Sequence, residues 1–165
     1  MKYGEIKYVD VLNGDGLRVS LFVSGCRNGC KGCFNKILKD FNFGDKFTNK
    51  EESKILETIK NKKINYSGVS LLGGDPFEEE NAKELVKLAK KVKEANKSVW
   101  AWSGYTFEDI RNNKIKSELL KYIDILIDGK FIEEQRDLNL KYRGSLNQRV
   151  IDVKKSTIDK IVLYT

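Results

Sequence analysis

The chain has 165 residues, of which 40% are hydrophobic and 33% are charged, and its formal net charge is +7. We expect one globular domain spanning residues 1–165 with a single sizeable core. No stretch approaches the roughly 20 apolar residues of a membrane helix, and the N-terminus lacks the apolar core of a signal peptide, so we expect no membrane association and a cytoplasmic location.

The chain contains no histidine. This excludes Ser-His-Asp hydrolysis, Cys-His proteolysis, haem ligation by histidine and zinc sites that mix cysteine with histidine. The positive charge is compatible with nucleic-acid binding, but the lysines are densest around residues 54–63 and 83–97, where they alternate with glutamate at helical spacing. That pattern favours solvated helix faces over a phosphate-binding track.

In chain order, hydrophobic patterning predicts alternating strands and helices. The first two strands are expected at Ile6–Leu12 and Leu17–Ser24, on either side of the turn Asn13–Gly16, and Thr48–Glu51 is a capping box that opens a helix. The later elements are a strand at Gly68–Leu72, a helix with apolar core positions from Ala82 to Val92, a strand at Ser98–Trp102, a weaker helix at Ile115–Tyr122, a strand at Ile123–Ile127, and terminal strands at Arg149–Val153 and Lys160–Tyr164.

The three cysteines, Cys26, Cys30 and Cys33, fall within eight residues. A disulfide scaffold would spread them along the chain, while structural zinc sites and ferredoxin-type clusters use four ligands. Three thiolates on one short loop are suited to three irons of a cubane, which leaves the fourth iron open. The alternatives are a redox thiol cluster or a zinc site shared between chains.

Four predicted strands are each followed by a glycine-containing loop: Gly25–Cys26, Gly73–Pro76, Ser103–Tyr105 and Asp128–Lys130. In parallel α/β sheets and barrels, ligands bind at the carboxyl ends of the strands, so we expect these loops to form one pocket. The strands are too few for a complete eight-fold barrel. We therefore expect an α/β fold with a largely parallel, curved sheet that forms an open partial (β/α) barrel.

The motifs of the N-terminal third resemble those of the glycyl-radical-enzyme activases, a family of the radical S-adenosylmethionine (SAM) superfamily. These motifs are Asn13–Arg18, Phe22 and the segment Gly25–Asn35 with its C-x3-C-x2-C spacing. The subgroup that activates the anaerobic ribonucleoside-triphosphate reductase is similar in its short chain and in the segments matching Gly73–Pro76, Trp102–Tyr105 and Arg143–Arg149. Asp15 stands where activases often have proline, and no second cysteine cluster marks an inserted ferredoxin-like domain.

The resemblance implies a radical SAM type of fold, a [4Fe–4S] cluster bound by the three cysteines, and SAM chelating the fourth iron. The residues implied in SAM binding are Gly32 and Phe34 at the adenine, on either side of the cluster ligand Cys33, Gly73 and Gly74 at the methionyl amine with Asp75 supporting their loop, Ser103 and Gly104 at the sulfonium or ribose, and Lys130 at the carboxylate. Two other interpretations stay open: Lys130 as an exposed charge, and Gly73–Pro76 as a simple turn. Arg143–Arg149 is either a polar hairpin or a docking surface.

The implied reaction is reductive cleavage of SAM to a 5′-deoxyadenosyl radical that creates a glycyl radical on the partner reductase. The electron must come from an external donor, because the chain encodes no second centre. Two alternatives share some of these features. One is a radical SAM enzyme that converts a small molecule, and the other is a non-enzymatic basic protein that binds nucleic acid or stores metal.

Overall fold

Seven strands form one open, mixed sheet in the computed structural model, which describes residues 1–165. The strands are β1 (Lys2–Asp10), β2 (Leu17–Val23), β3 (Asp45–Lys46), β4 (Tyr66–Gly73), β5 (Ser98–Trp102), β6 (Ile125–Asp128) and β7 (Arg149–Asp152). The helices are α1 (Asn49–Ile59), α2 (Glu79–Glu94), α3 (Phe107–Asn112) and α4 (Lys114–Leu120), with 3-10 turns at Lys36–Lys39 and Glu133–Gln135.

The sheet order is β3-β1-β2-β4-β5-β6-β7. The four central strands β2, β4, β5 and β6 are parallel, whereas β1, β3 and β7 pair antiparallel with their neighbours. The prediction of an open α/β sheet is confirmed, but only its centre is parallel. The turn between β1 and β2 is too short for the crossover that a parallel pair requires, so these strands form a hairpin.

Local signals in the sequence account for the longer helices. Thr48 and Glu51 form the predicted capping box at the start of α1. The apolar positions Ala82, Leu85, Ala89 and Val92 of α2 are buried, as their spacing predicts. Helix α3 was not predicted from the sequence, although Thr106 and Asp109 form a second capping box at its start.

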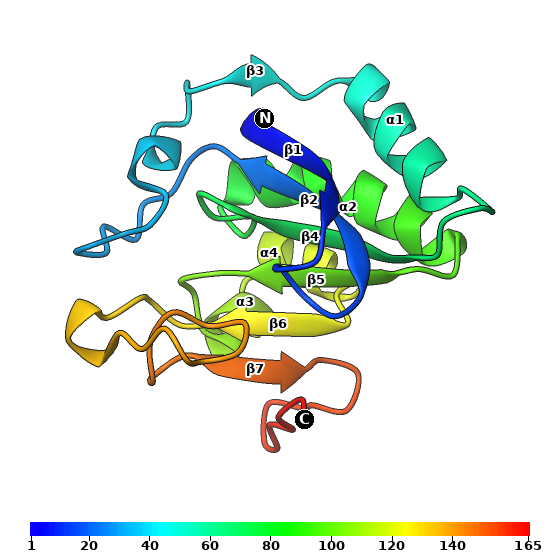
Figure 1. Cartoon of the computed structure of the whole chain (residues 1–165). Coiled ribbons are helices and arrows are strands. Elements are labelled where there is room, and N and C mark those ends of the chain that lie inside the picture. The colour runs from blue at the N-terminus through cyan, green and yellow to red at the C-terminus, as the bar shows by residue number, and fades with distance from the viewer.

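The main core lies between the sheet and the helices, and Figure 1 shows α2, α3 and α4 on one face of the sheet. Along β5, Val99 and Ala101 belong to this core, while Trp100 belongs to a smaller cluster on the other face with Ile125 and Ile127. This alternation follows from the two-residue period of a strand. Apolar side chains therefore pack on both faces of the central strands.

The predicted terminal strand Lys160–Tyr164 is wrong. The segment makes one isolated bridge, between Leu163 and Ile151 of β7, and backbone hydrogen bonds join Asp152 N to the Val162 carbonyl and Tyr164 N to the Val150 carbonyl, each at 2.9 Å. Its apolar residues pack against the sheet without forming a ladder.

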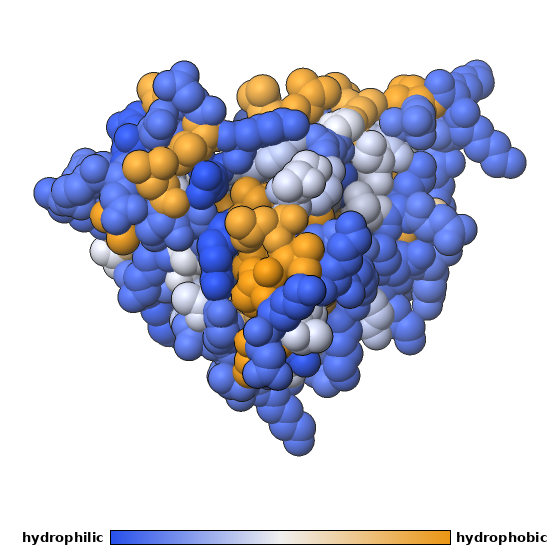
Figure 2. All heavy atoms as spheres, turned by 90° about the horizontal axis from the view of Figure 1, so that it is seen from below, coloured by the Kyte–Doolittle hydropathy of each residue, from blue (hydrophilic) through white to orange (hydrophobic).

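Charged side chains dominate much of the surface. Figure 2, a view from the β7 side, shows a mostly hydrophilic face with an apolar patch near its middle. On α1 and α2, Lys54, Lys83 and Lys87 are exposed while Ile55 and Leu85 are buried, as their helical spacing predicts. None of the helices combines the length and the apolar character needed to cross a bilayer.

The parallel strands all direct their carboxyl ends to one end of the sheet. Figure 1 shows the loop after β2 (light blue) and the loop after β6 (gold to orange) at this same end. The loops after β4 and β5 belong to the same edge because β2, β4, β5 and β6 are parallel neighbours in the sheet. The fold thus brings together the four glycine-containing loops expected from the sequence.

Candidate functional site

A cavity of about 160 Å³ opens at the carboxyl ends of the parallel strands. Nine of the sequence-predicted residues line it: Cys26, Cys30, Cys33, Phe34, Gly73, Gly74, Asp75, Ser103 and Gly104. Gly32 and Lys130 do not, and the Lys130 side chain is exposed. Gly129, next to Lys130, does line the cavity. The structure therefore collects the cysteine loop and the loops after β4, β5 and β6 around one space.

The start of the cysteine loop is fixed by the buried carboxylate of Glu78. The Arg27 backbone N–H donates to Glu78 Oε1 at 2.7 Å, and the Arg27 guanidinium donates to Glu78 Oε2 at 2.6 Å and to Glu80 Oε1 at 2.5 Å. The Tyr105 hydroxyl donates to Glu78 Oε1 at 3.1 Å, and burial beside this carboxylate raises the pKa of Tyr105 well above its usual value. Glu78 thus ties the cysteine loop to the loop after β5.

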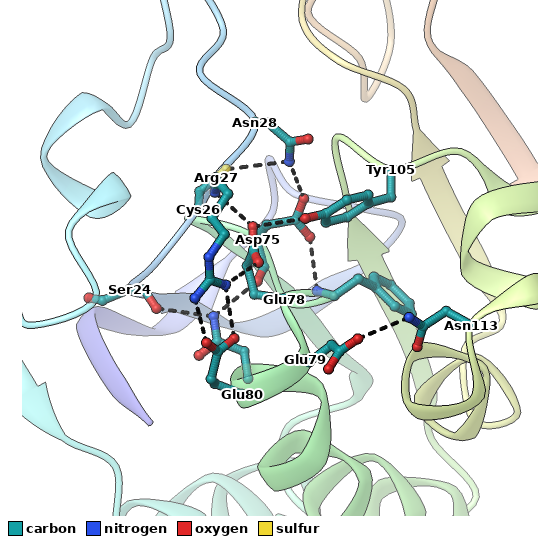
Figure 3. Close-up of polar contacts among 12 residues, drawn as sticks. Ser24, Cys26, Arg27, Asn28, Asp75, Glu78, Glu79, Glu80, Tyr105 and Asn113 are labelled. Atoms are coloured by element: carbon teal, nitrogen blue, oxygen red, sulfur yellow. Dashed lines mark hydrogen bonds and ion pairs between the residues drawn. The ribbon is translucent and has the colours of Figure 1, made fainter.

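Asp75 is completely buried and joins three loops (Figure 3). Its carboxylate accepts hydrogen bonds from Phe77 N at 2.9 Å, Gly104 N at 2.8 Å, Ser103 Oγ at 2.9 Å and Asn28 Nδ2 at 2.7 Å. Both oxygens are occupied by these donors, so Asp75 is a structural acceptor. This agrees with the expectation that it supports the loop after β4.

Burial also changes the acidity of two groups in the site. Desolvation raises the pKa of Asp75 to about 6, although its hydrogen bonds act in the opposite direction. Desolvation raises the pKa of the Cys26 thiol to about 11, with further contributions from the nearby Asp75 and Glu78 charges. The cluster-free Cys26 is therefore protonated at neutral pH, and a bound metal must displace that proton.

The glycines after β4 are required by the close approach of backbone segments. A Cβ on Gly74 would lie 2.5 Å from the Gly25 carbonyl oxygen and 2.6 Å from that of Leu38. Gly73 has a φ of +111°, and a Cβ there would lie 2.6 Å from Val23 N. These glycines let the cysteine loop pack directly on the end of β4. The Gly73 carbonyl accepts a hydrogen bond from Asn35 Nδ2 at 3.1 Å.

Sequence reasoning missed six residues that line the cavity, namely Asn28, Asn35, Leu72, Trp102, Phe131 and Gln148, whereas Gly129 belongs to the predicted Asp128–Lys130 loop. Asn28 and Asn35 lie within or next to the cysteine motif, so polar residues flanking the ligands were an available signal. Phe131 and Gln148 come from the segment after β6, and no spacing rule connects them to the cysteines. Phe131 packs on Phe34 with ring centroids 5.0 Å apart.

The donor set suits a cubane cluster better than a single ion. All three cysteines are free thiols on the wall of one cavity. No three cysteine or carboxylate side chains are grouped around a single point in the way that one metal ion requires. In a cubane each cysteine binds a different iron, so the three sulfurs need not converge, and the chain has no fourth cysteine to close the site.

A groove of about 450 Å³ adjoins the cavity on the face of the sheet opposite the helices, and we call it the open-face groove. It shares Phe34, Asn35, Leu72, Trp102, Phe131 and Gln148 with the cavity. Its other apolar walls include Leu12 and Leu138, each 79% exposed. Together the cavity and the groove reach the size of ordinary small-molecule sites and continue onto exposed apolar surface.

The Arg143–Arg149 segment lies beside the groove and also contacts its own fold. The Arg143 guanidinium donates to the Gln148 carbonyl at 2.6 Å, and Arg149 forms ion pairs with Asp128 and Glu108 at 2.5 and 2.7 Å. Asn147 Nδ2 donates to the Lys130 carbonyl at 2.8 Å, so this segment holds the loop after β6. Part of its polar character is therefore structural.

Comparison with known proteins gives a consistent result. A family model described as a 4Fe-4S single cluster domain matches residues 12–151. The chain is 42% identical over 150 residues to an anaerobic ribonucleoside-triphosphate reductase-activating protein of Vibrio cholerae, covering 90% of this chain and 96% of the relative. Proteins with the same name from Escherichia coli K12 and Enterobacteria phage T4 are 37% and 38% identical over 152 residues, covering 91% of this chain and 97% and 93% of those relatives.

Proposed function

Because the chain belongs to the family of anaerobic ribonucleoside-triphosphate reductase-activating proteins, we propose that it is a radical SAM activase that generates a glycyl radical on that reductase. The observation that carries the proposal is the convergence of three free cysteines with the loops after β4 and β5 on one cavity. The open sheet would then be the partial (β/α) barrel of a radical SAM domain.

Cys26, Cys30 and Cys33 would hold the [4Fe–4S] cluster, and SAM would occupy its open iron. When bound, the cluster supplies the electron that cleaves SAM to methionine and a 5′-deoxyadenosyl radical, which takes a hydrogen atom from a glycine of the reductase. The protein keeps the cysteine loop in one position through Asp75 and Glu78, whose carboxylates accept hydrogen bonds from that loop.

The cavity of about 160 Å³ is smaller than a typical ligand pocket, so SAM would extend into the open-face groove that shares its wall. Phe34 and Phe131 offer apolar surface for the adenine at this junction, in support of the Phe34 assignment. Gly73, Gly74, Ser103 and Gly104 are the other proposed SAM neighbours. Gly32 and Lys130 would join them only after movement of their loops, because neither lines the cavity.

The glycine-bearing segment of the reductase would enter through the open-face groove. The groove is continuous with the cavity and is lined by exposed Leu12, Leu138 and Phe34. Exposed apolar side chains next to a pocket are typical of surfaces that bind a partner and exclude water. The electron would come from an external donor, since three cysteines provide for one cluster only.

Single cysteine variants test the cluster assignment. Anaerobic reconstitution of the wild-type chain is expected to give about four iron atoms per chain and the visible absorption of a [4Fe–4S] cluster. Cys26→Ala, Cys30→Ala and Cys33→Ala should each lose most of that absorption, whereas Lys31→Ala, on the same loop with a side chain 79% exposed, should keep it. A full iron content in any of the cysteine variants would contradict the proposal.

A further inference from the structure

The side chain of Asn28 lies between the first cysteine and the buried Asp75 carboxylate. Its amide nitrogen, Nδ2, donates to Asp75 Oδ2 at 2.7 Å and to Cys26 Sγ at 3.4 Å. An amide nitrogen carries two hydrogens, so both contacts can be made at once. Figure 3 shows Asn28 reaching toward both partners.

Asp75 fixes which end of the amide faces the sulfur. The Asp75 carboxylate also accepts from Phe77 N and Gly104 N, and an amide oxygen placed against it would put two acceptors together. The Asn28 NH₂ group must therefore point to Asp75, and its second hydrogen is directed to Cys26 Sγ. The orientation of Asn28 is thus set by hydrogen bonding rather than by the shape of the side chain, which is nearly symmetric.

The loop after β5 is also shaped around this amide. A Cβ on Gly104 would lie 2.5 Å from Asn28 Nδ2 and 2.6 Å from Asn28 Cγ. Gly104 has no positive φ, so its backbone conformation is open to other residues. The absence of a side chain at position 104 therefore makes room for Asn28, which is an observation independent of the hydrogen bonds.

We propose that Asn28 is a positioning residue that donates an N–H···S hydrogen bond to Cys26 and thereby raises the reduction potential of the cluster bound there. This inference rests on the proposed function. Reduction adds negative charge to the cluster and its thiolates, and a donor aimed at a ligand sulfur stabilises that charge. The other two cysteines have no side-chain donor of this kind.

The test is a redox titration of the reconstituted protein without SAM, followed by electron paramagnetic resonance of the reduced cluster. Asn28→Leu removes the donor at similar volume, and Asn28→Ala removes it without added bulk. Each should lower the equilibrium constant for reduction by about tenfold, which equals about 59 mV for a one-electron couple. Asn35→Leu is the matched control, because Asn35 lines the same cavity but donates to the Gly73 carbonyl instead of a sulfur.

Gly104→Ala should give a shift in the same direction, because the added methyl group displaces the Asn28 amide. In the double variant, Gly104→Ala should add little to the shift caused by Asn28→Ala, since both substitutions remove the same Asn28–Cys26 hydrogen bond. Potentials of the Asn28 variants equal to those of wild type and Asn35→Leu would overturn this inference while leaving the proposed function intact. If the wild-type chain takes up no cluster, the proposed function fails and the inference fails with it.

Discussion

Removing the Asp75 carboxylate should destabilise the protein by separating the loops that it joins. Asp75→Ala leaves Phe77 N, Gly104 N, Ser103 Oγ and Asn28 Nδ2 without their common acceptor. The Ser103 hydroxyl can rotate and the half-buried Asn28 amide can turn to water, so the main loss comes from the two backbone donors. At about 1–3 kcal/mol for the buried Phe77 N–H and about 1 kcal/mol for the part-buried Gly104 N–H, we expect the free energy of unfolding at pH 7 to fall by about 2–4 kcal/mol.

Urea denaturation of the cluster-free chain measures this loss, with equal m-values indicating that both proteins unfold in the same way. Asp45→Ala is the control, because Asp45 is exposed and should change stability by less than about 0.5 kcal/mol. A loss below about 1 kcal/mol in Asp75→Ala would refute the idea that this carboxylate holds the three loops together.

Three further predictions concern acidity, a buried cation and a loop contact. Since the folded-state pKa of Asp75 is raised to about 6, the stabilising contribution of Asp75 is complete below the unfolded pKa of 3.8 and falls by about 3 kcal/mol in all as pH rises through about 6. The difference in the free energy of unfolding between wild type and Asp75→Ala, measured by urea denaturation at several pH values, should therefore shrink from about pH 4 to pH 6. A difference that grows with pH would contradict this. Arg18→Met should lower the free energy of unfolding by about 3 kcal/mol or more, because Arg18 is buried and its guanidinium donates to Ser70 Oγ, Ser98 Oγ and three backbone carbonyls. The control is Arg111→Met, at an exposed arginine, in the same denaturation assay. An effect of Arg18→Met no larger than that of the control would refute the prediction. Gly74→Ala should reduce both iron uptake and SAM affinity, because the added Cβ would collide with the carbonyls of Gly25 and Leu38. Iron analysis and calorimetry measure the two effects. Normal iron uptake would contradict the prediction, because it would show that the loop tolerates the methyl group.

The strongest local patterns in the sequence predicted the elements that position the site. The apolar runs Gly68–Leu72 and Ser98–Trp102 lie within β4 and β5, and the glycine loops after them meet the cysteine loop. These predictions succeeded because buried parallel strands leave a short-range hydrophobic signal, and because parallel strands direct their carboxyl ends to one edge of the sheet.

The features that failed depend on contacts between distant segments. Lys160–Tyr164 has the apolar run of a strand, yet its pairing with β7 is limited to one bridge. Asn28 gains its role only when the loop after β4 brings Asp75 beside it, 47 residues further along the chain. Gly74 was expected to make room for a ligand, and the structure adds a second reason, the close approach of the Gly25 and Leu38 carbonyls.

The most direct test of the central claim is anaerobic incubation of the reconstituted, reduced protein with SAM and the anaerobic ribonucleoside-triphosphate reductase, with 5′-deoxyadenosine measured by chromatography and the glycyl radical by electron paramagnetic resonance. The account predicts that both products appear with the wild-type chain and that neither appears with Cys26→Ala. A fully loaded wild-type cluster that yields neither 5′-deoxyadenosine nor a glycyl radical in the presence of the reductase would contradict it.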